Sequence, residues 1–170
     1  MTRDEFIAAA TAAARSASIV SGFSPGIAVA QAALESAWGN SQLARLANNY
    51  FGIKARRGRA VAELPTLEYV DAAPLRTVAR FARYESMEEC FADRDCMIAS
   101  LAVYREAREA SGDPEAFIRA LAQHWATDPD YADKVLYVYR AHGLAELDKS
   151  TTQTTKSGSS GAPRLKKETL

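Results

Sequence analysis

Six helix-start signals occur along this chain, and one stretch with strand-like alternation interrupts them. Each signal is a short polar residue that can accept hydrogen bonds from the free N–H groups of a first helical turn. The signals are Thr2 with Glu5, Ser24 before Pro25, Ser41, Ser86 with Glu89, Asp113 before Pro114 and Asp128 before Pro129. Between residues 50 and 84, β-branched and aromatic residues alternate with polar ones, and Gly58, Pro65 and Pro74 punctuate them. The pattern predicts an α+β fold that is mainly helical, with a helical body and a small antiparallel β-hairpin lobe.

Glycine or asparagine interrupts the apolar periodicity where most of these helices should end. We expect ends at Gly22, Gly39, Asn48-Asn49, near Tyr104 and at His142-Gly143. After Asp148 the composition changes to Lys, Ser, Thr, Gly and Gln without apolar periodicity. We therefore predict one folded domain over residues 1–148, with the β lobe at about 54–84, and a flexible basic tail over residues 149–170.

The charge of the chain is balanced overall but divided unevenly. Its 170 residues include 21 Lys or Arg and 21 Asp or Glu, and 48% are hydrophobic. These values suit one domain with a single core, and no apolar run approaches the ~20 residues of a membrane helix. The lobe from Lys54 to Tyr84 carries a net charge of +4, the tail +4 and the remaining body −8. A DNA-binding helical domain is disfavoured, so we expect no nucleic-acid partner, whereas the basic lobe suits an anionic polymer or is an ordinary solvated surface.

Chemistry that depends on metals, cofactors or nucleophiles has little support in the sequence. Cys90 and Cys96 lie six residues apart on a predicted helix, which separates their Cα atoms by about 9 Å and excludes a disulfide. His124 and His142 lack a metal-ligand spacing. A phosphate-binding glycine loop is also absent from the sequence. We therefore predict two reduced structural thiols, no metal site and no cofactor.

Glu35 is the most informative single residue, because it interrupts an apolar helix. Its neighbours three and four positions away are Gln31, Ala32, Trp38 and Gly39, and none of them is a cation. Burial among such neighbours, close to the negative end of the helix dipole, would favour the protonated carboxyl. A carboxyl that is partly protonated near neutral pH is what a general acid requires. The alternative is that Glu35 points to solvent from a half-exposed alanine face.

A second acid could come from the predicted hairpin. Glu63, Glu68 and Asp71 are the candidates in this stretch. Strand alternation places Glu68 and Thr66 on the face opposite Tyr69, so a strand could direct Glu68 towards the helix that carries Glu35. The alternative is a solvated charge on the wet face of a hairpin.

Four motifs follow one another in an order that is typical of a known family. They are residues 30–41 (AQAALESAWGNS), 48–54 (NNYFGIK), 66–69 (TLEY) and 126–132 (ATDPDYA). Together they resemble glycoside hydrolase family 73, the glucosaminidases found in flagellar rod-assembly proteins, autolysins and phage endolysins. The resemblance covers roughly residues 1–145 and implies a lysozyme-like fold. It also implies hydrolysis of peptidoglycan at the β-1,4 bond between N-acetylglucosamine and N-acetylmuramic acid.

The resemblance assigns roles to two acids and to a set of substrate-binding side chains. Glu35 would protonate the departing glycosidic oxygen, and Glu68 would activate water or stabilise the oxocarbenium-like transition state. Inverting, retaining and substrate-assisted routes are all compatible with these residues. Aromatic faces in the set would stack on sugar rings, with core packing as the alternative role. The predicted substrate-binding residues are Trp38, Asn49, Tyr50, Phe51, Lys54, Tyr69, Trp125 and Tyr131.

One position departs from the family motif, which commonly has Tyr where this chain has Trp125. Tryptophan can stack on a sugar, but its indole N–H is a donor only, so it cannot replace a phenol that acts as acceptor or acid. Tyr131 is a nearby phenol, for which packing in the core is the alternative role.

The implied partner is the glycan strand of peptidoglycan, and we expect a monomer without a membrane span. We expect no cleavable Sec signal, because Asp4 and Glu5 precede the N-terminal alanines and Arg15 interrupts them. Action in the periplasm or cell wall would then follow holin-assisted lysis or a dedicated secretion system. The competing hypothesis is a non-catalytic cell-wall glycan-binding or assembly module on the same fold.

Overall fold

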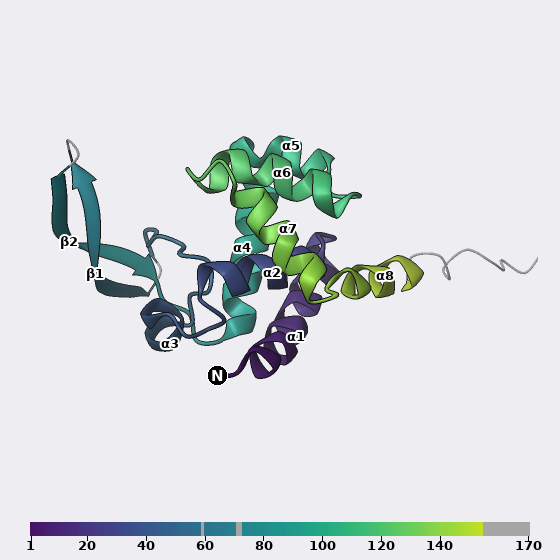
Figure 1. Cartoon of the computed structure of the whole chain (residues 1–170), viewed down its shortest axis with the longest axis horizontal. Helices are drawn as coiled ribbons and strands as arrows, with labels where there is room; N and C mark the ends of the chain where they lie inside the picture. The colour runs from purple at the N-terminus through teal and green to yellow at the C-terminus, as the bar shows by residue number, and fades with distance from the viewer. Residues whose placement is uncertain (59, 71–72, 155–170) are drawn as a thin grey trace, which may run out of the picture.

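The computed structural model describes residues 1–58, 60–70 and 73–154. Its helices are α1 (Arg3–Ser21), α2 (Pro25–Glu35), α3 (Gln42–Ala47), α4 (Met87–Ser100), α5 (Arg105–Glu109), α6 (Pro114–Trp125), α7 (Tyr131–Ala141) and α8 (Ala145–Thr154). A short 3-10 helix, Ala102–Tyr104, joins α4 to α5, and the strands are β1 (Val61–Val70) and β2 (Ala73–Ala82). The helices form a body from which the two-stranded hairpin extends, as the sequence pattern predicts (Figure 1).

The central helix of the body is α2, against which α1, α7 and α8 pack (Figure 1). Every residue of α2 from Pro25 to Ala33 is buried, so this helix is enclosed on all sides. Ala10, Ala13 and Ala14 of α1 are buried as well, and their small side chains let neighbouring helices lie close together. The core therefore holds α2 rigidly, and Glu35 is the last residue of that helix.

The predicted helix starts are largely confirmed by the capping contacts. Thr2 and Glu5 form the expected reciprocal pair, with Glu5 N donating to Thr2 Oγ1 at 3.2 Å and Thr2 N donating to Glu5 Oε2 at 2.8 Å. Ser24, Ser41, Ser86 and Asp113 also accept from first-turn N–H groups. One start differs, because Asp128 accepts from Asp130 N in a turn and α7 begins only at Tyr131.

Two predicted helix ends are wrong by several residues. The second helix stops at Glu35 rather than at Gly39, because the backbone turns into the left-handed region at Ala37. The helix expected to continue to about Tyr104 is interrupted at Leu101, whose extended backbone (φ −80°, ψ 132°) ends α4. In both cases a local backbone change, and not a helix-breaking residue type, ends the helix.

The helix predicted to end at His142-Gly143 does end there, because α7 stops at Ala141, but the helical part of the chain does not finish at this point. The chain forms a further helix, α8, that crosses the expected start of the tail at residue 149 and continues to Thr154. The remainder of the predicted tail, residues 155–170, lies outside the described residues.

Asp148 attaches α8 to the start of α2. Its Oδ1 accepts from Ser24 Oγ at 2.8 Å and from Gly26 N at 3.0 Å, and its Oδ2 accepts from Tyr139 Oη at 2.6 Å. The backbones meet so closely here that a Cβ added at Gly26 would lie 2.5 Å from the carbonyl oxygen of Leu144. These partners are more than 100 residues away from Asp148 or on another helix, so local sequence could not indicate the contact.

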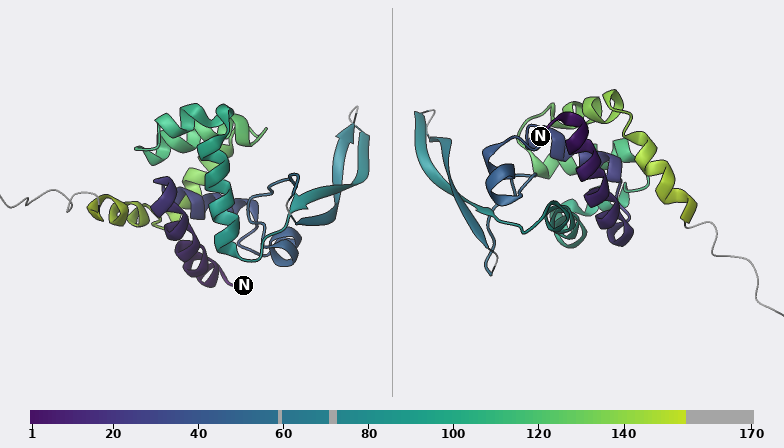
Figure 2. Two further views of the ribbon diagram at one scale, coloured as in Figure 1. Left: turned by 180° about the vertical axis from the view of Figure 1, so that it is seen from behind. Right: turned by 90° about the horizontal axis from the view of Figure 1, so that it is seen from below.

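The hairpin is antiparallel and is fastened to the body at its base. Its pairing runs from Val61 opposite Ala82 to Val70 opposite Ala73. Asn49 holds the base, since its Nδ2 donates to the carbonyl oxygens of Ile53 at 2.9 Å and Ala82 at 2.8 Å. The hairpin and α8 lie at opposite ends of the described structure in all the views (Figures 1 and 2).

A second contact joins the hairpin base to α4. Arg56 and Tyr84 both donate to Oδ2 of the buried Asp93, the phenol at 2.7 Å. On the same helix Cys90 is buried and Cys96 is exposed, and both thiols are free, as predicted. In the described part of the chain no helix is both long and apolar enough to cross a membrane.

Candidate active site

The backbone directly after Glu35 is unusual. Ala37, Trp38 and Gly39 have φ angles of 50°, 59° and 75°, and the left-handed region costs roughly 1–2 kcal/mol for a residue with a side chain. Ser36 holds this turn, because its buried hydroxyl donates to Ala32 O at 2.6 Å and accepts from Gly39 N at 2.8 Å. Strained turns that are held in this way are concentrated at functional sites.

The carboxyl group of Glu35 is exposed and is oriented by two aromatic donors. Oε1 accepts from Tyr131 Oη at 2.6 Å and from Trp125 Nε1 at 3.2 Å. Within the described residues it forms no ion pair. The hypothesis that burial among apolar neighbours would favour the protonated carboxyl is therefore wrong, and the alternative of a solvent-facing side chain is confirmed. The two hydrogen-bond partners of Glu35 come from α6 and α7.

Both partners donate to Glu35. Burial, followed by the charge of Glu35, raises the pKa of Tyr131, so the phenol is held in its protonated form. The indole N–H of Trp125 has no acceptor function. At the position where the family motif commonly has Tyr, this chain therefore supplies a donor to the acid.

A buried polar chain lies behind Tyr131. Gln31 Nε2 donates to Tyr131 Oη at 3.0 Å, and Arg94 donates to Gln31 Oε1 through Nε at 2.9 Å and Nη2 at 2.7 Å. Arg94 Nη1 pairs with Asp95 Oδ1 at 2.5 Å, and Ser21 Oγ donates to Asp95 Oδ2 at 2.7 Å. Gln31 and Arg94 have no exposed surface.

Sequence reasoning missed Gln31 and Arg94, although a signal for Arg94 existed. Phe91 lies three residues before it and Ile98 four residues after it, and both are fully buried on the same face of α4. A charged residue between two core positions at helical spacing indicates a buried, partnered ion.

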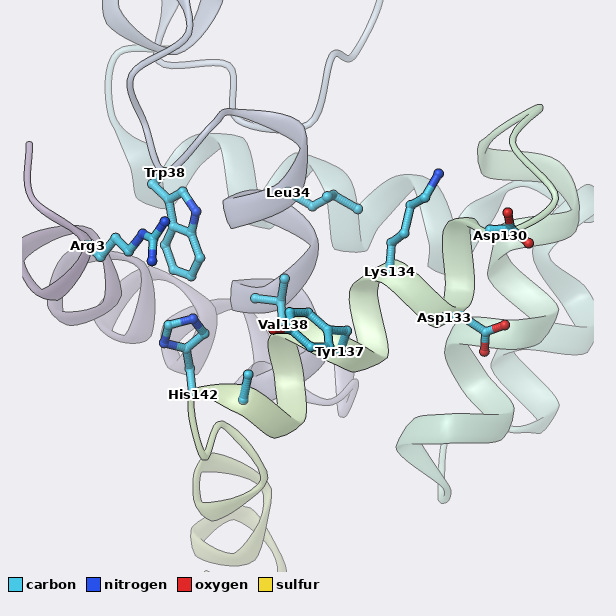
Figure 3. Close-up of a pocket in the computed structure, with 10 residues that line it drawn as sticks. Arg3, Leu34, Trp38, Asp130, Asp133, Lys134, Tyr137, Val138 and His142 are labelled. Atoms are coloured by element: carbon cyan, nitrogen blue, oxygen red, sulfur yellow. The ribbon is translucent and has the colours of Figure 1, made fainter.

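A pocket of about 610 Å³ opens beside the residue that precedes Glu35 (Figure 3). Leu34, Trp38, Tyr137 and Val138 supply apolar surface, and charged side chains from α1 and α7 line its edge. The Trp38 ring contacts His142 edge-on with centroids 4.7 Å apart. Of these residues, only Trp38 was predicted to bind substrate.

Three of the predicted substrate-binding residues are instead parts of the core. Asn49, Tyr50 and Phe51 are 1%, 7% and 3% exposed. Asn49 is engaged with the hairpin base, and Phe51 packs edge-on against Phe91 with centroids 4.8 Å apart. The motif that contains them therefore builds the junction between body and hairpin, and the side chains of Asn49 and Phe51 are not accessible to a ligand.

Of the other predicted residues, Tyr131 is buried as well, at 5% exposed, and it reaches the site through its hydrogen bond to Glu35. The rest retain accessible surface or lie outside the described side chains. Lys54 is exposed, with its Nζ 4.2 Å from the centre of the Phe81 ring, and Trp125 is half-buried. Glu68 belongs to β1, where it pairs with Leu75 of β2. The side chains of Glu68 and Tyr69 are outside the described part of the structure, so their roles stay predictions.

The chemistry offered by the described residues is that of an oriented acid. Among them, no three His, Cys, Asp or Glu side chains gather where they could hold a metal ion. Glu35 combines an exposed carboxyl with a rigid helix and two fixed donors, an arrangement that can deliver a proton to a ligand lying over the end of α2.

Comparison with known proteins identifies the class. The family model Glucosaminidase, described as mannosyl-glycoprotein endo-beta-N-acetylglucosaminidase, matches residues 11–144. The chain belongs to this glucosaminidase family of glycoside hydrolases, as its motifs predicted.

Individual relatives include peptidoglycan hydrolases. The peptidoglycan hydrolase FlgJ of Vibrio parahaemolyticus is 40% identical over 123 residues, covering 69% of this chain and 40% of that protein. The exo-glucosaminidase LytG of Bacillus subtilis is 35% identical over 130 residues, covering 73% of this chain and 46% of LytG. The chain thus spans less than half the length of these relatives.

Solved structures confirm the predicted fold. The catalytic domain of the autolysin Auto from Listeria monocytogenes superposes with a TM-score of 0.77 and 28% identity, covering 85% of this chain and 86% of Auto's. A truncated glycoside hydrolase domain of Salmonella typhimurium FlgJ gives a TM-score of 0.69 and 31% identity, covering 84% and 98%.

Proposed function

We propose that this protein hydrolyses peptidoglycan glycan strands at the β-1,4 bond between N-acetylglucosamine and N-acetylmuramic acid, with Glu35 as the general acid. The observation that carries the proposal is the carboxyl of Glu35, exposed at the end of a buried helix and oriented by Tyr131 and Trp125. A general acid must be accessible to the leaving group and must be held in position while the proton moves. Glu35 meets both conditions.

The relatives support a wall glycan as substrate. FlgJ of Vibrio parahaemolyticus is named a peptidoglycan hydrolase and LytG an exo-glucosaminidase. A relative from Lactococcus lactis, 30% identical, is named a probable N-acetylmuramidase, which would cut the other glycosidic bond of the strand. Such a substrate would place the action in the periplasm or cell wall.

The role of Glu35 is tested on purified cell-wall sacculi. Parent protein, Glu35→Gln and the control Glu109→Gln would be compared by the rate at which soluble muropeptides appear. Glu109 lies on α5 with an exposed side chain, so its amide variant should retain parental activity. We expect Glu35→Gln to lose activity by at least about a hundredfold, typical of a general acid. If Glu35→Gln and the parent release products equally fast, the proposal is wrong.

The bond that is cut is tested on the same digests. Borohydride reduction labels the new reducing ends, which are N-acetylglucosamine for a glucosaminidase and N-acetylmuramic acid for a muramidase. Labelled glucosaminitol supports the proposed bond, whereas labelled muramitol would assign the neighbouring one. Binding to sacculi without new reducing ends would instead support a non-catalytic wall-binding module.

We propose Glu68 as the second carboxylate. The support is its place in β1 of the hairpin lobe and its match to the third family motif. Glu63 of the same strand is exposed and lies 3.5 Å from Arg80, so Glu63→Gln is a matched control. Glu68→Gln should lower the turnover strongly and leave the thermal melting unchanged, whereas unchanged turnover would remove Glu68 from the mechanism.

We further propose that accessible side chains around the acid bind the glycan. Trp38 and Trp125 are half-buried rings that can stack on sugars. Lys54 begins the basic lobe, whose net charge of +4 suits the carboxylates of peptidoglycan. In the inactive Glu35→Gln background, Lys54→Gln should weaken binding to sacculi, and more so at low ionic strength.

A further inference from the structure

A continuous series of hydrogen bonds leads from the buried core to the carboxyl of Glu35. It runs from Arg94 to Gln31, from Gln31 to Tyr131, and from Tyr131 to Glu35, with donor–acceptor distances between 2.6 and 3.0 Å. Arg94 and Gln31 are 0% exposed and Tyr131 is 5% exposed. Solvent therefore cannot supply alternative partners to the buried members of the series.

The chemistry of Arg94 determines the direction of this series. A guanidinium has donors and no acceptor, so the group that faces it must be the carbonyl oxygen of Gln31. The amide nitrogen of Gln31 then faces Tyr131 and donates to its phenolic oxygen. The amide nitrogen of Gln31 cannot accept a hydrogen bond, so the single proton of the phenol points to Glu35 instead.

The direction of these hydrogen bonds decides which carboxyl oxygen of Glu35 can carry a proton. Oε1 receives two hydrogen bonds, one from Tyr131 and one from Trp125, which together use its two lone pairs. A proton on the carboxyl must therefore reside on Oε2. The arrangement leaves one defined oxygen of the exposed carboxyl to carry the proton that is transferred.

We propose that Gln31, held by Arg94, is a positioning residue that keeps Tyr131 donating to Glu35 and so directs the acidic proton to Oε2. This inference rests on the proposed function, in which Glu35 is the general acid. Gln31 has no exposed surface, so it cannot touch the glycan. It acts on the reaction only through Tyr131.

The test reverses one hydrogen bond and keeps the shape of the side chain. Gln31→Glu retains an oxygen for Arg94 but presents Tyr131 with an acceptor in place of a donor, so the phenol can turn its proton away from Glu35. We expect kcat on soluble glycan fragments of peptidoglycan to fall by about tenfold or more, with KM unchanged. The control Gln42→Glu adds the same charge at an exposed position of α3 and should retain parental kcat.

A double-mutant cycle with Tyr131→Phe separates this mechanism from a direct effect of the added charge. If Gln31 acts through Tyr131, Gln31→Glu causes no further loss of kcat in the Tyr131→Phe background. Equal losses in both backgrounds would show that the charge acts on Glu35 directly, and would overturn the proposal. Parental kcat in the Gln31→Glu single variant would overturn it as well.

Thermal melting accompanies each assay, because Gln31 is part of the core. If Gln31→Glu is not folded at the assay temperature, the same cycle is run with Gln31→Met, which removes the donor and adds no charge. The prediction there is also a loss of kcat that disappears in the Tyr131→Phe background. A fully active Gln31 variant beside an inactive Glu35→Gln rejects only the positioning role, whereas an active Glu35→Gln rejects the proposed function.

Discussion

Replacing Gly26 by alanine tests how closely α2 approaches the connection between α7 and α8. A Cβ at this position would lie 2.5 Å from the carbonyl oxygen of Leu144, 2.6 Å from Cε2 of Tyr139 and 3.1 Å from Oδ2 of Asp148. The first of these atoms belongs to the backbone, so it cannot move away by a rotamer change. The substitution must shift α8 or the end of α7 relative to α2.

The expected magnitude follows from two opposing effects. Alanine favours a helical backbone over glycine by about 1 kcal/mol at most, and less near a helix start. Overpacking of a tight contact costs about 1–3 kcal/mol, and a shift also weakens the hydrogen bonds that Asp148 accepts from Ser24 and Gly26. We expect a net loss of about 2 kcal/mol in the free energy of unfolding, or roughly 4–8 °C in Tm for a domain of this size.

The measurement is thermal unfolding followed by circular dichroism, with Gly112→Ala as the matched control. A Cβ at Gly112 would meet nothing within 4 Å, so this control should stay within about 0.5 kcal/mol of the parent. If Gly26→Ala melts at the same temperature as Gly112→Ala, the close approach of the two backbones does not exist in solution. A higher Tm for Gly26→Ala would refute the reasoning even more directly.

Three further predictions concern the acid, the thiols and the hairpin. Tyr131→Phe should lower kcat more than Trp125→Phe, because the phenol donates at 2.6 Å and the indole at 3.2 Å; steady-state kinetics that give the reverse order would contradict this. A thiol reagent should modify Cys96 but not Cys90 in the folded protein and both in denaturant, because burial raises the pKa of Cys90 to about 12. The unfolded chain releases the Cys90 proton at a lower pH than the folded chain does. The raised pKa therefore contributes to the free energy of unfolding below pH 9.0, the ordinary pKa, and this contribution is lost as the pH rises towards 12. Unfolding curves at alkaline pH measure the loss. Asn49→Ala should destabilise the base of the hairpin by about 1–3 kcal/mol and speed proteolysis there, and an unchanged cleavage rate would speak against the tether.

Local elements were predictable where neighbouring residues encode them. The capping pair of Thr2 and Glu5 and the Ser24-Pro25 start depend on hydrogen bonds and backbone angles within one turn, and both are confirmed. The helix α8 was missed for the opposite reason. Its apolar periodicity is weak, and it is held by contacts of Asp148 with the start of α2, more than 100 residues earlier.

In the candidate active site, too, residue types were predictable from the sequence and their surroundings were not. The sequence motifs identified the family and singled out Glu35 as the candidate acid, but residue spacing left open whether this side chain is buried or exposed, and it is exposed. Asn49 and Phe51 were expected at the substrate, and they serve the junction between body and hairpin instead. A motif reports which residues are needed and does not distinguish contact with a ligand from support of the fold.

What the sequence by itself determined is the order of most helices and the hairpin, the family motifs and the choice of Glu35 as the candidate acid, because these depend on residue type and short spacing. Only the tertiary structure decided what surrounds that acid. Tyr131 and Trp125 lie 96 and 90 residues after Glu35, and Arg94 reaches the same site from α4 through Gln31. Hydrogen-bond direction depends on which groups meet in space, so the contacts that Gln31 and Glu35 make with side chains of α4, α6 and α7 are what convert an ordinary glutamate into an oriented one.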